Sequence, residues 1–181
     1  MGRPGPIPLA LARVPSPIGT MLVVTDADHR VRALDWDDHE SRLHQLLGRH
    51  YGPGGVALAE APAPAPLHRA LDAYFAGEVT AIDAIAVATG GTDFQRTVWS
   101  ALRGIRAGET LSYHALAARI GRPAAIRAVG AANGANPIGI VVPCHRLIGA
   151  DGALTGYGGG LARKRWLLRH EGVRVEEWLS H

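Results

Sequence analysis

The sequence predicts an α/β (α+β) fold in which a small N-terminal domain, with an antiparallel sheet and helices, precedes a mainly helical C-terminal domain. Its 181 residues, 47% of them apolar, are enough for one ordinary domain or two small ones with a sizeable core. β-rich runs dominate the first half, whereas apolar residues from Phe94 to Ile105 recur at helical spacing. Thr89-Gly90-Gly91-Thr92 breaks both patterns, so we place the domains at residues 1–90 and 91–181.

The first ordered feature expected in the N-terminal domain is a β-hairpin. The Gly/Pro-rich segment Met1–Pro8 is expected to fray, as chain termini commonly do. Two β-rich runs follow at Ile18–Val24 and Val31–Trp36. Polar residues between them, including Asp26 and His29, favour a turn, so the two runs are predicted to pair as a hairpin.

Helices and a proline-rich loop are expected to complete this domain. His39–His50 places three leucines on one side, as an amphipathic helix does. The prolines and glycines of residues 52–66 remove backbone donors and predict a loop. Leu67–Ala76 is then expected to form a helix and Ala81–Val87 a strand.

Two short helices are predicted next in the C-terminal domain. Ser112 is a suitable N-cap for a helix over Tyr113–Ile120, and Gly121 suits the position after its end. Pro123 suits the first position of a second helix, with Ala124–Asn133 following. This arrangement is typical of a helix-turn-helix, although short helical hairpins also occur in proteins that never bind DNA.

The second of these helices has a face of small side chains. Ile126, Val129 and Asn133 share one side. The opposite side carries one arginine among alanines: Ala124, Arg127, Ala128 and Ala131. A solvent-facing helix usually carries long charged side chains, so this face suggests close approach to another surface, such as a DNA minor groove about 6 Å wide. The alternative is that alanine is simply the best helix former.

The single cysteine follows an apolar run. Ile138–Val142 is β-branched and short, so we expect a buried strand that delivers Pro143-Cys144-His145-Arg146 at its end. A thiol is nucleophilic as thiolate, and a neighbouring cation or base lowers its pKa or takes its proton. His145 and Arg146 could serve in these ways. The alternative is a buried cysteine whose neighbouring histidine points elsewhere.

Glu171 breaks a local rule. It follows a predicted helix over Leu161–His170, where the helix dipole disfavours negative charge. A carboxylate there could instead orient an imidazole that takes a proton from a thiol. The alternative is an exposed glutamate paired with Arg169 or Arg174.

Composition excludes several classes of protein. One cysteine cannot form an internal disulfide or a multi-thiolate zinc site, and no apolar run approaches the length of about 18 residues that spans a bilayer. We therefore expect a soluble, cytoplasmic protein that does not bind membranes. Residues 1–90 carry a formal charge of −3 and residues 91–181 one of +6. A nucleic acid would engage the basic half, although basic surfaces also serve solubility alone.

Several motifs of the second half occur together in one known family. The chain resembles the O6-alkylguanine-DNA alkyltransferases, also called methylated-DNA–protein-cysteine methyltransferases, over residues 93–172. The N-terminal half is similar mainly in layout. The motifs that carry the resemblance are Ile140-Val-Val-Pro-Cys-His-Arg146, Arg127-Ala-Val-Gly130, Asn136-Pro137, Ser112-Tyr113, Tyr157-Gly-Gly-Gly-Leu161 and His170-Glu171-Gly172.

The resemblance implies direct-reversal DNA repair by a protein that acts once. Cys144 would irreversibly accept the alkyl group of O6-alkylguanine, and of O4-alkylthymine, after minor-groove binding and base flipping. The expected partner is double-stranded DNA containing the lesion. We expect a monomer, with cooperative binding along DNA left open, and no cofactor. Two other classes remain: an alkyltransferase-like lesion-binding module, which the cysteine disfavours, and a cysteine hydrolase using Cys144 and His145.

The same resemblance implies roles for individual residues. His145 would deprotonate Cys144 through a water, Glu171 would orient His145, Tyr113 would assist flipping and the leaving guanine, and Asn136 would brace the turn that carries the cysteine. Arg127 would fill the gap left by the flipped base. The expected DNA-binding residues are Arg127, Tyr113, Ala128, Ala131 and Arg146, and those of the base pocket are Val142, Pro143, Tyr157, Gly158 and Gly159.

Two departures from the family pattern matter. Gly158 stands where many members carry serine, so one hydroxyl donor to O6 is missing and the substrate range is in question. The N-terminal half also lacks the cysteines and histidines with which some relatives bind zinc. The resemblance therefore implies no metal.

Overall fold

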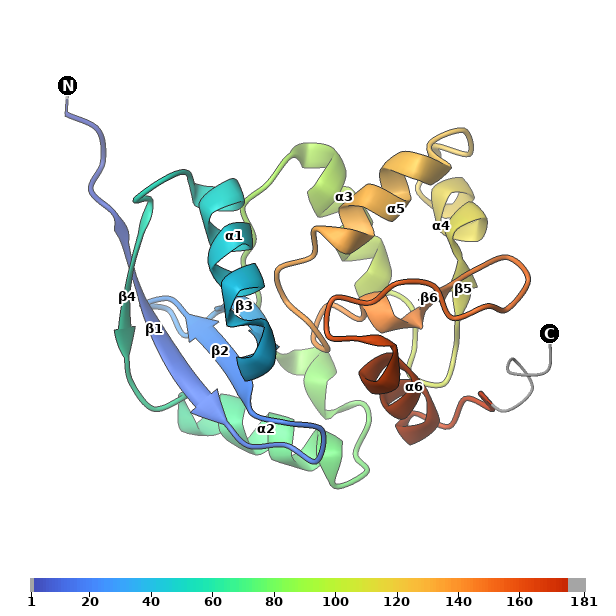
Figure 1. Ribbon diagram of the computed structural model, residues 1–181, viewed down its shortest axis with the longest axis horizontal. Helices are drawn as coiled ribbons and strands as arrows, with labels where there is room; N and C mark the ends of the chain where they lie inside the picture. Colours follow the sequence, from blue (N-terminus) through green and yellow to red (C-terminus); the bar gives the residue numbers. More distant parts are fainter. Residues whose placement is uncertain (1, 176–181) are drawn as a thin grey trace.

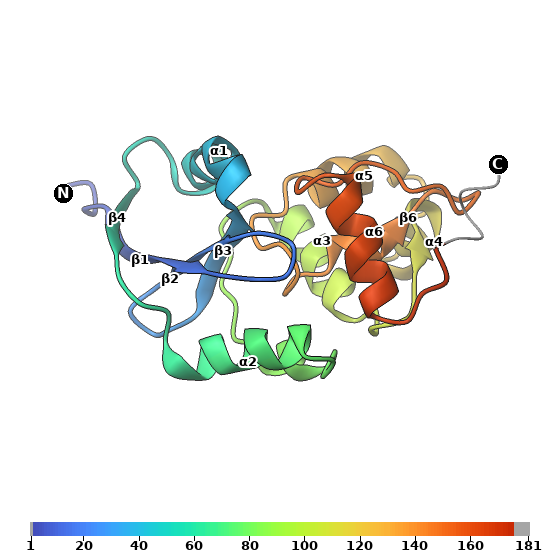
Figure 2. The ribbon, with the colours of Figure 1, turned by 60° about the horizontal axis from the view of Figure 1, so that its bottom comes forward.

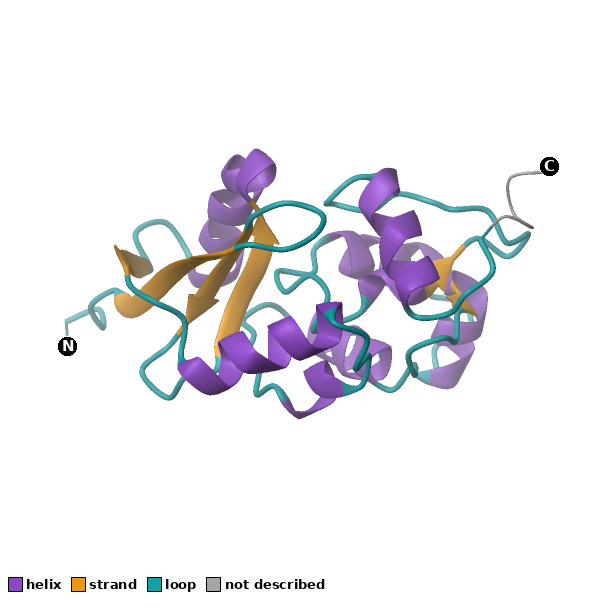
Figure 3. Ribbon diagram, turned by 90° about the horizontal axis from the view of Figure 1, so that it is seen from below, coloured by secondary structure: helices purple, strands orange, loops and turns teal. Residues whose placement is uncertain are grey.

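The computed structural model describes residues 2–175 and places the two halves of the chain side by side (Figure 1). Within these residues a four-stranded sheet and two α-helices form the N-terminal half, and four α-helices with a two-stranded sheet form the C-terminal half. Figure 3 shows this division, with the larger strands gathered in one half and helices predominating in the other. The predicted mixed α/β fold class is confirmed.

The large sheet contains the predicted hairpin. Its strands are β1 (Ile7–Val14), β2 (Met21–Thr25), β3 (Val31–Trp36) and β4 (Val56–Glu60), in the order β3-β2-β1-β4. β2 runs antiparallel to both neighbours, which confirms the hairpin although its first strand begins at Met21 rather than Ile18. β4 runs parallel to β1. The sheet is therefore mixed, and the prediction of an antiparallel sheet is wrong for this strand pair.

Two of these strands were not predicted, because they lie in segments that contain prolines. β1 includes Ile7 and Pro8, which were expected to fray, and the predicted loop over residues 52–66 contains β4. The two strands pair with each other in parallel register, with Leu9 opposite Leu58. Because that pairing joins segments far apart in sequence, local composition could not reveal it.

The segment predicted as a strand over Ala81–Val87 is mostly a short 3-10 helix, Ala81–Ala84. Ile82 and Ile85 are buried while the two residues between them are exposed, a spacing of three that suits a helical turn and not a strand. Only Val87 pairs with the sheet, through a parallel bridge to Val31.

Helices cover both faces of the large sheet. Figure 2 shows α1 (Glu40–Tyr51) on one side of the strands and α2 (Ala65–Phe75) on the other. The alternation of a strand divides the side chains of β2 between them. Leu22 and Val24 pack in the cluster that contains Leu43 and Leu47 of α1, whereas Met21 and Val23 belong to the cluster that contains Leu71 of α2. β2 is consequently buried along its whole length.

The C-terminal half follows the predicted helical pattern closely. Its helices are α3 (Asp93–Arg103), α4 (Tyr113–Arg119), α5 (Ile126–Gly134) and α6 (Leu161–His170), and β5 (Leu111–Ser112) pairs in parallel with β6 (Leu147–Ile148). The Ser112 side chain accepts a hydrogen bond from the Ala115 N–H, as expected of an N-cap. Gly121 follows α4 with φ 76°. Pro123, however, lies in a turn three residues before α5 and does not begin that helix.

A tight turn replaces the predicted strand over Ile138–Val142. The Leu34 N–H of β3 donates to the Pro137 carbonyl at 2.9 Å, and the Gly139 N–H donates to the Leu34 carbonyl at 2.9 Å. The chain then reverses, with Ile140 at φ 65°, a conformation that β-branched residues rarely adopt. Within the run Ile138 pairs with β3, through a parallel bridge to Leu34, and the run as a whole is buried between the halves.

One hydrophobic cluster joins the halves. It includes Leu34 and Trp36 of β3, Leu71 of α2, and Trp99 and Leu102 of α3, all nearly or fully buried. The two halves therefore share one core, which fixes their relative position. Among the residues that the structure describes, no helix combines the length and apolar character needed to cross a membrane.

Truncating a side chain in this shared core tests its contribution to stability. Leu102→Ala is expected to lower the free energy of unfolding by about 2–5 kcal/mol, because it removes buried methyl groups and leaves a cavity. Leu161 is 45% exposed, so Leu161→Ala, the matched control, should cost less than about 1 kcal/mol. Urea unfolding of both variants gives the comparison. Equal losses would contradict the shared core described above.

Candidate active site

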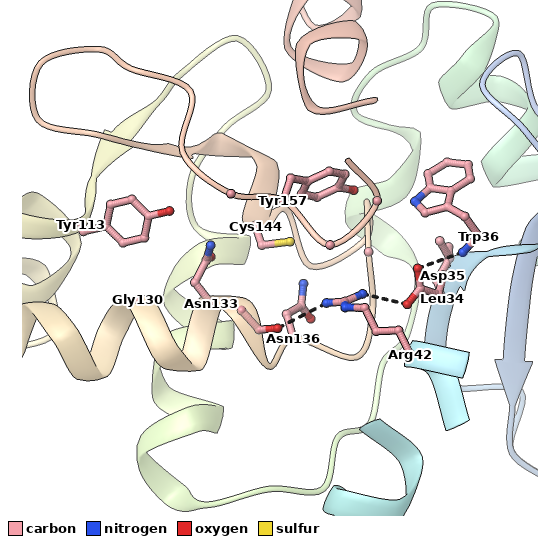
Figure 4. A pocket seen from close by; sticks show the side chains of 15 residues that line it. Leu34, Asp35, Trp36, Arg42, Tyr113, Gly130, Asn133, Asn136, Cys144 and Tyr157 are labelled. Carbon is pink, nitrogen blue, oxygen red and sulfur yellow. Dashed lines mark hydrogen bonds and ion pairs between the residues drawn. The ribbon is translucent and has the colours of Figure 1, made fainter. Parts of the chain in front are cut away.

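A cavity of about 370 Å³ opens between the two halves, with the single cysteine on its wall (Figure 4). The C-terminal half contributes Tyr113, Asn133, Asn136, Cys144 and Tyr157, together with glycines of α5 and of the loop before α6. The N-terminal half contributes Leu34, Asp35, Trp36 and Arg42. Its volume lies in the range usual for small-ligand pockets.

Cys144 begins a single 3-10 turn, Cys144–Arg146, immediately after the reversed segment. The residue is only 6% exposed. Burial raises the pKa of the thiol, and a hydrogen bond with Asn136 opposes that effect in part. The resting sulfur is therefore a protonated thiol, and a base is needed to make it nucleophilic.

Asn136 fastens the turn that presents the cysteine. Its Nδ2 donates to the carbonyls of Val142 at 2.9 Å and Ile138 at 3.2 Å, while its Oδ1 accepts from the Ile138 N–H at 3.0 Å. These bonds span the segment in which Ile140 has positive φ. Asn136 is therefore placed where it can hold this turn.

His145 points away from solvent and is tied to Glu171. Its Nε2 lies 2.7 Å from Glu171 Oε1, and both side chains are fully buried. Burial lowers the pKa of His145, although the charge of Glu171 opposes this, so the ring is neutral near pH 7. A carboxylate only accepts, so Nε2 carries the proton and Nδ1 holds the free electron pair. Nδ1 is buried without a hydrogen-bond partner among the described residues.

Glu171 is the buried carboxylate that pairs with His145. Besides His145, its oxygens accept from Arg146 Nε at 2.8 Å, Arg146 Nη2 at 2.9 Å and the Tyr74 hydroxyl at 2.8 Å. Burial alone would raise the pKa of this carboxyl, but the charges and hydrogen bonds of His145 and Arg146 lower it to about 2. The alternative of an exposed glutamate paired with Arg169 or Arg174 is wrong, because Glu171 is buried and its ion-pair partners are His145 and Arg146.

Arg146 does not belong with the expected DNA-binding residues. Its side chain is 2% exposed, and besides the two bonds to Glu171 it donates to the Ile105 carbonyl. A buried guanidinium whose donors are occupied inside the protein cannot contact a phosphate. Arg146 instead neutralises Glu171 and anchors it to the chain after α3.

The loop before α6 forms the other side of the cavity. Tyr157, Gly158 and Gly159 line it as expected, but Val142 and Pro143 do not. These two residues directly precede Cys144, and the Val142 carbonyl accepts a hydrogen bond from the Cys144 N–H at 2.8 Å.

Two polar contacts hold this loop. The Tyr113 hydroxyl lies 2.7 Å from Thr155 Oγ1, and Lys164 Nζ donates to the Thr155 carbonyl at 2.9 Å and the Leu147 carbonyl at 2.7 Å. Burial lowers the pKa of Lys164 to about 8. The loop is therefore connected to both α4 and α6.

Helix α5 connects the cavity with an exposed face. Gly130 and Asn133 on one side of it line the cavity, while Arg127, Ala128 and Ala131 are exposed. The predicted face of small side chains is thus exposed and accessible to a partner. Ile126, expected on the packed side, is 37% exposed at the start of the helix.

The residues that the N-terminal half contributes were missed. Figure 4 shows the Arg42 guanidinium in the cavity between Asn136 and Asp35, and its Nη1 donates to Asp35 Oδ2 at 2.7 Å. A Cβ atom added to Gly158 would overlap this guanidinium. Asp35, a charged residue inside a β-rich run, and the absent side chain at Gly158 were the available signals, but neither connects α1 with the cysteine.

Comparisons with known proteins agree with this geometry. Residues 93–173 match the family described as 6-O-methylguanine DNA methyltransferase, DNA binding domain, and residues 11–89 match its ribonuclease-like domain. The methylated-DNA–protein-cysteine methyltransferase of Salmonella typhimurium is 54% identical over 88% of this chain and 94% of the relative. The relative of the same name from Mycobacterium tuberculosis is 60% identical over 58% of this chain and 63% of its own.

Solved structures give the same result. The M. tuberculosis OGT structure in complex with DNA superposes with a TM-score of 0.76 at 43% identity, covering 90% of this chain and 92% of the other. The O6-methylguanine-DNA methyltransferase of Pyrococcus kodakaraensis gives 0.69 at 27% identity, covering 91% and 99%. The resemblance that the motifs indicated is confirmed. The chain belongs to the 6-O-methylguanine DNA methyltransferase family.

Proposed function

We propose that this protein repairs DNA by direct reversal, moving the alkyl group of O6-alkylguanine onto Cys144. The observation that carries the proposal is a thiol on a cavity wall, followed directly by a neutral buried histidine that is tied to an ionised carboxylate. The relatives' names describe methyl transfer from DNA to a protein cysteine, and one similar structure holds DNA.

The first step is removal of the thiol proton. The free electron pair of His145 Nδ1 accepts it through a bridging water, and the resulting imidazolium is stabilised by Glu171. Because the thiol is buried and protonated at rest, formation of the nucleophile depends on this base.

The alkyl transfer that follows needs no cofactor. The Cys144 sulfur forms a bond to the alkyl carbon as the bond between that carbon and O6 breaks, and the electron pair stays with guanine. Tyr113, on the cavity wall, donates a hydrogen bond to the departing base, which finally gains the proton that the thiol lost. The product is a thioether, which thiols do not reverse, and the chain has no second cysteine. Each molecule therefore acts once.

Helix α5 supplies the DNA contact in this proposal. Its exposed alanines, Ala128 and Ala131, let the helix approach the floor of a minor groove closely, while Arg127 enters the base stack in place of the flipped nucleotide. Flipping brings the alkylated base to the cavity, which adjoins the same helix through Gly130 and Asn133.

We further propose the finer features of this activity. The protein acts as a monomer on double-stranded DNA in the cytoplasm, and O4-alkylthymine is a second substrate. Residues 1–90 and 91–181 act as two domains of one site, because both line the cavity.

Intact mass spectrometry tests the proposed acceptor. One equivalent of duplex DNA carrying O6-methylguanine should add a single methyl group to the peptide that contains Cys144. Cys144→Ser should gain no methyl group yet still bind the lesion at matched salt concentration, because a hydroxyl is a far weaker nucleophile. An unmodified wild-type protein with a reduced thiol, or a methyl group on another residue, would refute the proposal.

Comparison of two substrates tests the role of Arg127. Arg127→Ala should slow transfer from duplex DNA by about one to two orders of magnitude, because the arginine inserted in the base stack offsets part of the few kcal/mol that flipping costs. Transfer from free O6-benzylguanine should be unchanged, since no base is flipped. Arg49→Ala, which removes an exposed arginine of α1, controls for charge. An equal loss with both substrates would show that Arg127 does not act in flipping.

The pH dependence of stability tests the charge of Glu171. Its pKa is about 2 in the folded protein against an ordinary 4.5, so ionisation stabilises the fold above about pH 4.5, and this contribution disappears as the pH falls toward 2. Glu171→Gln should therefore lose about 3 kcal/mol at neutral pH, and the difference from the wild type should shrink on acidification. Urea unfolding at several pH values measures this. A difference that is constant with pH would contradict an ionised Glu171.

A further inference from the structure

A hydroxyl group of the N-terminal half bonds directly to Glu171. Tyr74, on α2, donates a hydrogen bond of 2.8 Å to Glu171 Oε1 across 97 positions of sequence. Tyr74 is fully buried, and neither the cavity nor the roles proposed above include it.

This hydroxyl completes the shell of donors around one oxygen. Glu171 Oε1 also accepts from His145 Nε2 at 2.7 Å and from Arg146 Nη2 at 2.9 Å, whereas Oε2 accepts from Arg146 Nε. His145 and Arg146 belong to the same short turn as the cysteine. Tyr74 is thus the donor that holds the carboxylate from the opposite side of the interface between the halves.

The phenol itself is held firmly. His170 Nε2 lies 2.6 Å from the Tyr74 carbonyl oxygen, and the Tyr74 ring meets the rings of Phe75 and His170 edge-on with centroids 5.1 Å apart. The His170 ring in turn stacks on Trp166 at 4.7 Å. Aromatic packing of α2 against α6 therefore fixes where the hydroxyl points.

We propose that Tyr74 is a positioning residue for alkyl transfer, whose hydroxyl holds the Glu171 carboxylate so that His145 keeps its proton on Nε2 and presents Nδ1 as the base. The inference rests on the roles proposed above for Cys144, His145 and Glu171.

The hydrogen bond from Tyr74 should change the protonation of His145 in a definite direction. A donor to the carboxylate disperses its charge and weakens its attraction for a second proton on His145, which favours the neutral ring. The other groups that face His145 are Arg146, Lys164 and Tyr157. Arg146 and Lys164 also favour the neutral ring, whereas Glu171 favours the imidazolium. Tyr74 itself faces Glu171, Arg146, Tyr157 and His170.

Tyr74 itself stays protonated over the working pH range. Burial and the charge of Glu171 both raise the pKa of its phenol, so the hydroxyl remains a donor. The acidic limb of the rate profile, which lies below the ordinary histidine pKa of 6.5 because burial lowers the pKa of His145, consequently reports that ring, whereas Lys164, with a pKa of about 8, titrates above it. Removing the donor should make His145 easier to protonate.

The test is the pH profile of single-turnover transfer from free O6-benzylguanine. In Tyr74→Phe the midpoint of the acidic limb should rise by at least about half a unit, which corresponds to roughly a threefold loss of rate below the midpoint. The plateau at higher pH should change less. Tyr51→Phe, which removes another tyrosine hydroxyl bonded to Arg32 on the far face of the sheet, should leave the profile unchanged.

A second variant keeps the test valid if Tyr74→Phe folds poorly. Site-specific 3-fluorotyrosine at position 74 preserves the ring and strengthens the donor, so the midpoint should move in the opposite direction, to lower pH. Opposite shifts from the two changes cannot arise from damaged packing.

Several results would overturn the inference. One is a profile identical to that of the wild type in both variants. Another is an equal loss of rate at every pH without a shift, which would make the hydroxyl a structural contact only. Wild-type protein that transfers no alkyl group to Cys144 is a separate result, because it refutes the proposed function itself.

Discussion

A single buried carboxylate organises this molecule. Glu171 ends α6, and its oxygens receive donors from α2 and from the turn that carries the cysteine. A charge without solvent is tolerated only where every oxygen is paired, and here His145, Arg146 and Tyr74 provide the pairing. Arg146 extends the network to the chain after α3. Because the donors come from both halves, the same interaction helps to fix the fold and, in the proposed mechanism, prepares His145 as the base.

The surroundings of Cys144 keep its thiol protonated at rest. The thiol is buried and protonated, and it directly follows a turn in which Ile140 has a rarely populated conformation and which Asn136 holds by three hydrogen bonds. A protein that acts once benefits from this arrangement, since oxidation or stray alkylation of the cysteine would end its use. In the proposed mechanism reactivity then depends on His145, beside a cavity that both halves line.

The sequence was most informative where a signal is local. The bounds of α6 and the Ser112 cap followed from capping and periodicity, whereas one misplaced charge offered the pairing of His145 with Glu171 only as one of two alternatives, which the family resemblance favoured. The strands β1 and β4 and the turn before Cys144 did not, because prolines and a short apolar run resemble several structures until distant partners are known. Contacts across the two halves were invisible for the same reason. Arg42 and Tyr74 carry no local mark of their contacts, and nothing near Arg146 indicates that it is buried.

Nitrogen NMR of His145 tests the central claim most directly. Protein labelled with ¹⁵N on histidine, compared with a His145→Gln variant for assignment, would show which ring nitrogen carries the proton near pH 7. We predict a neutral ring with the proton on Nε2, facing an ionised Glu171, and an unprotonated Nδ1. A proton on Nδ1 alone, or an imidazolium ring at that pH, would contradict the account, because His145 would then have no electron pair available to activate Cys144.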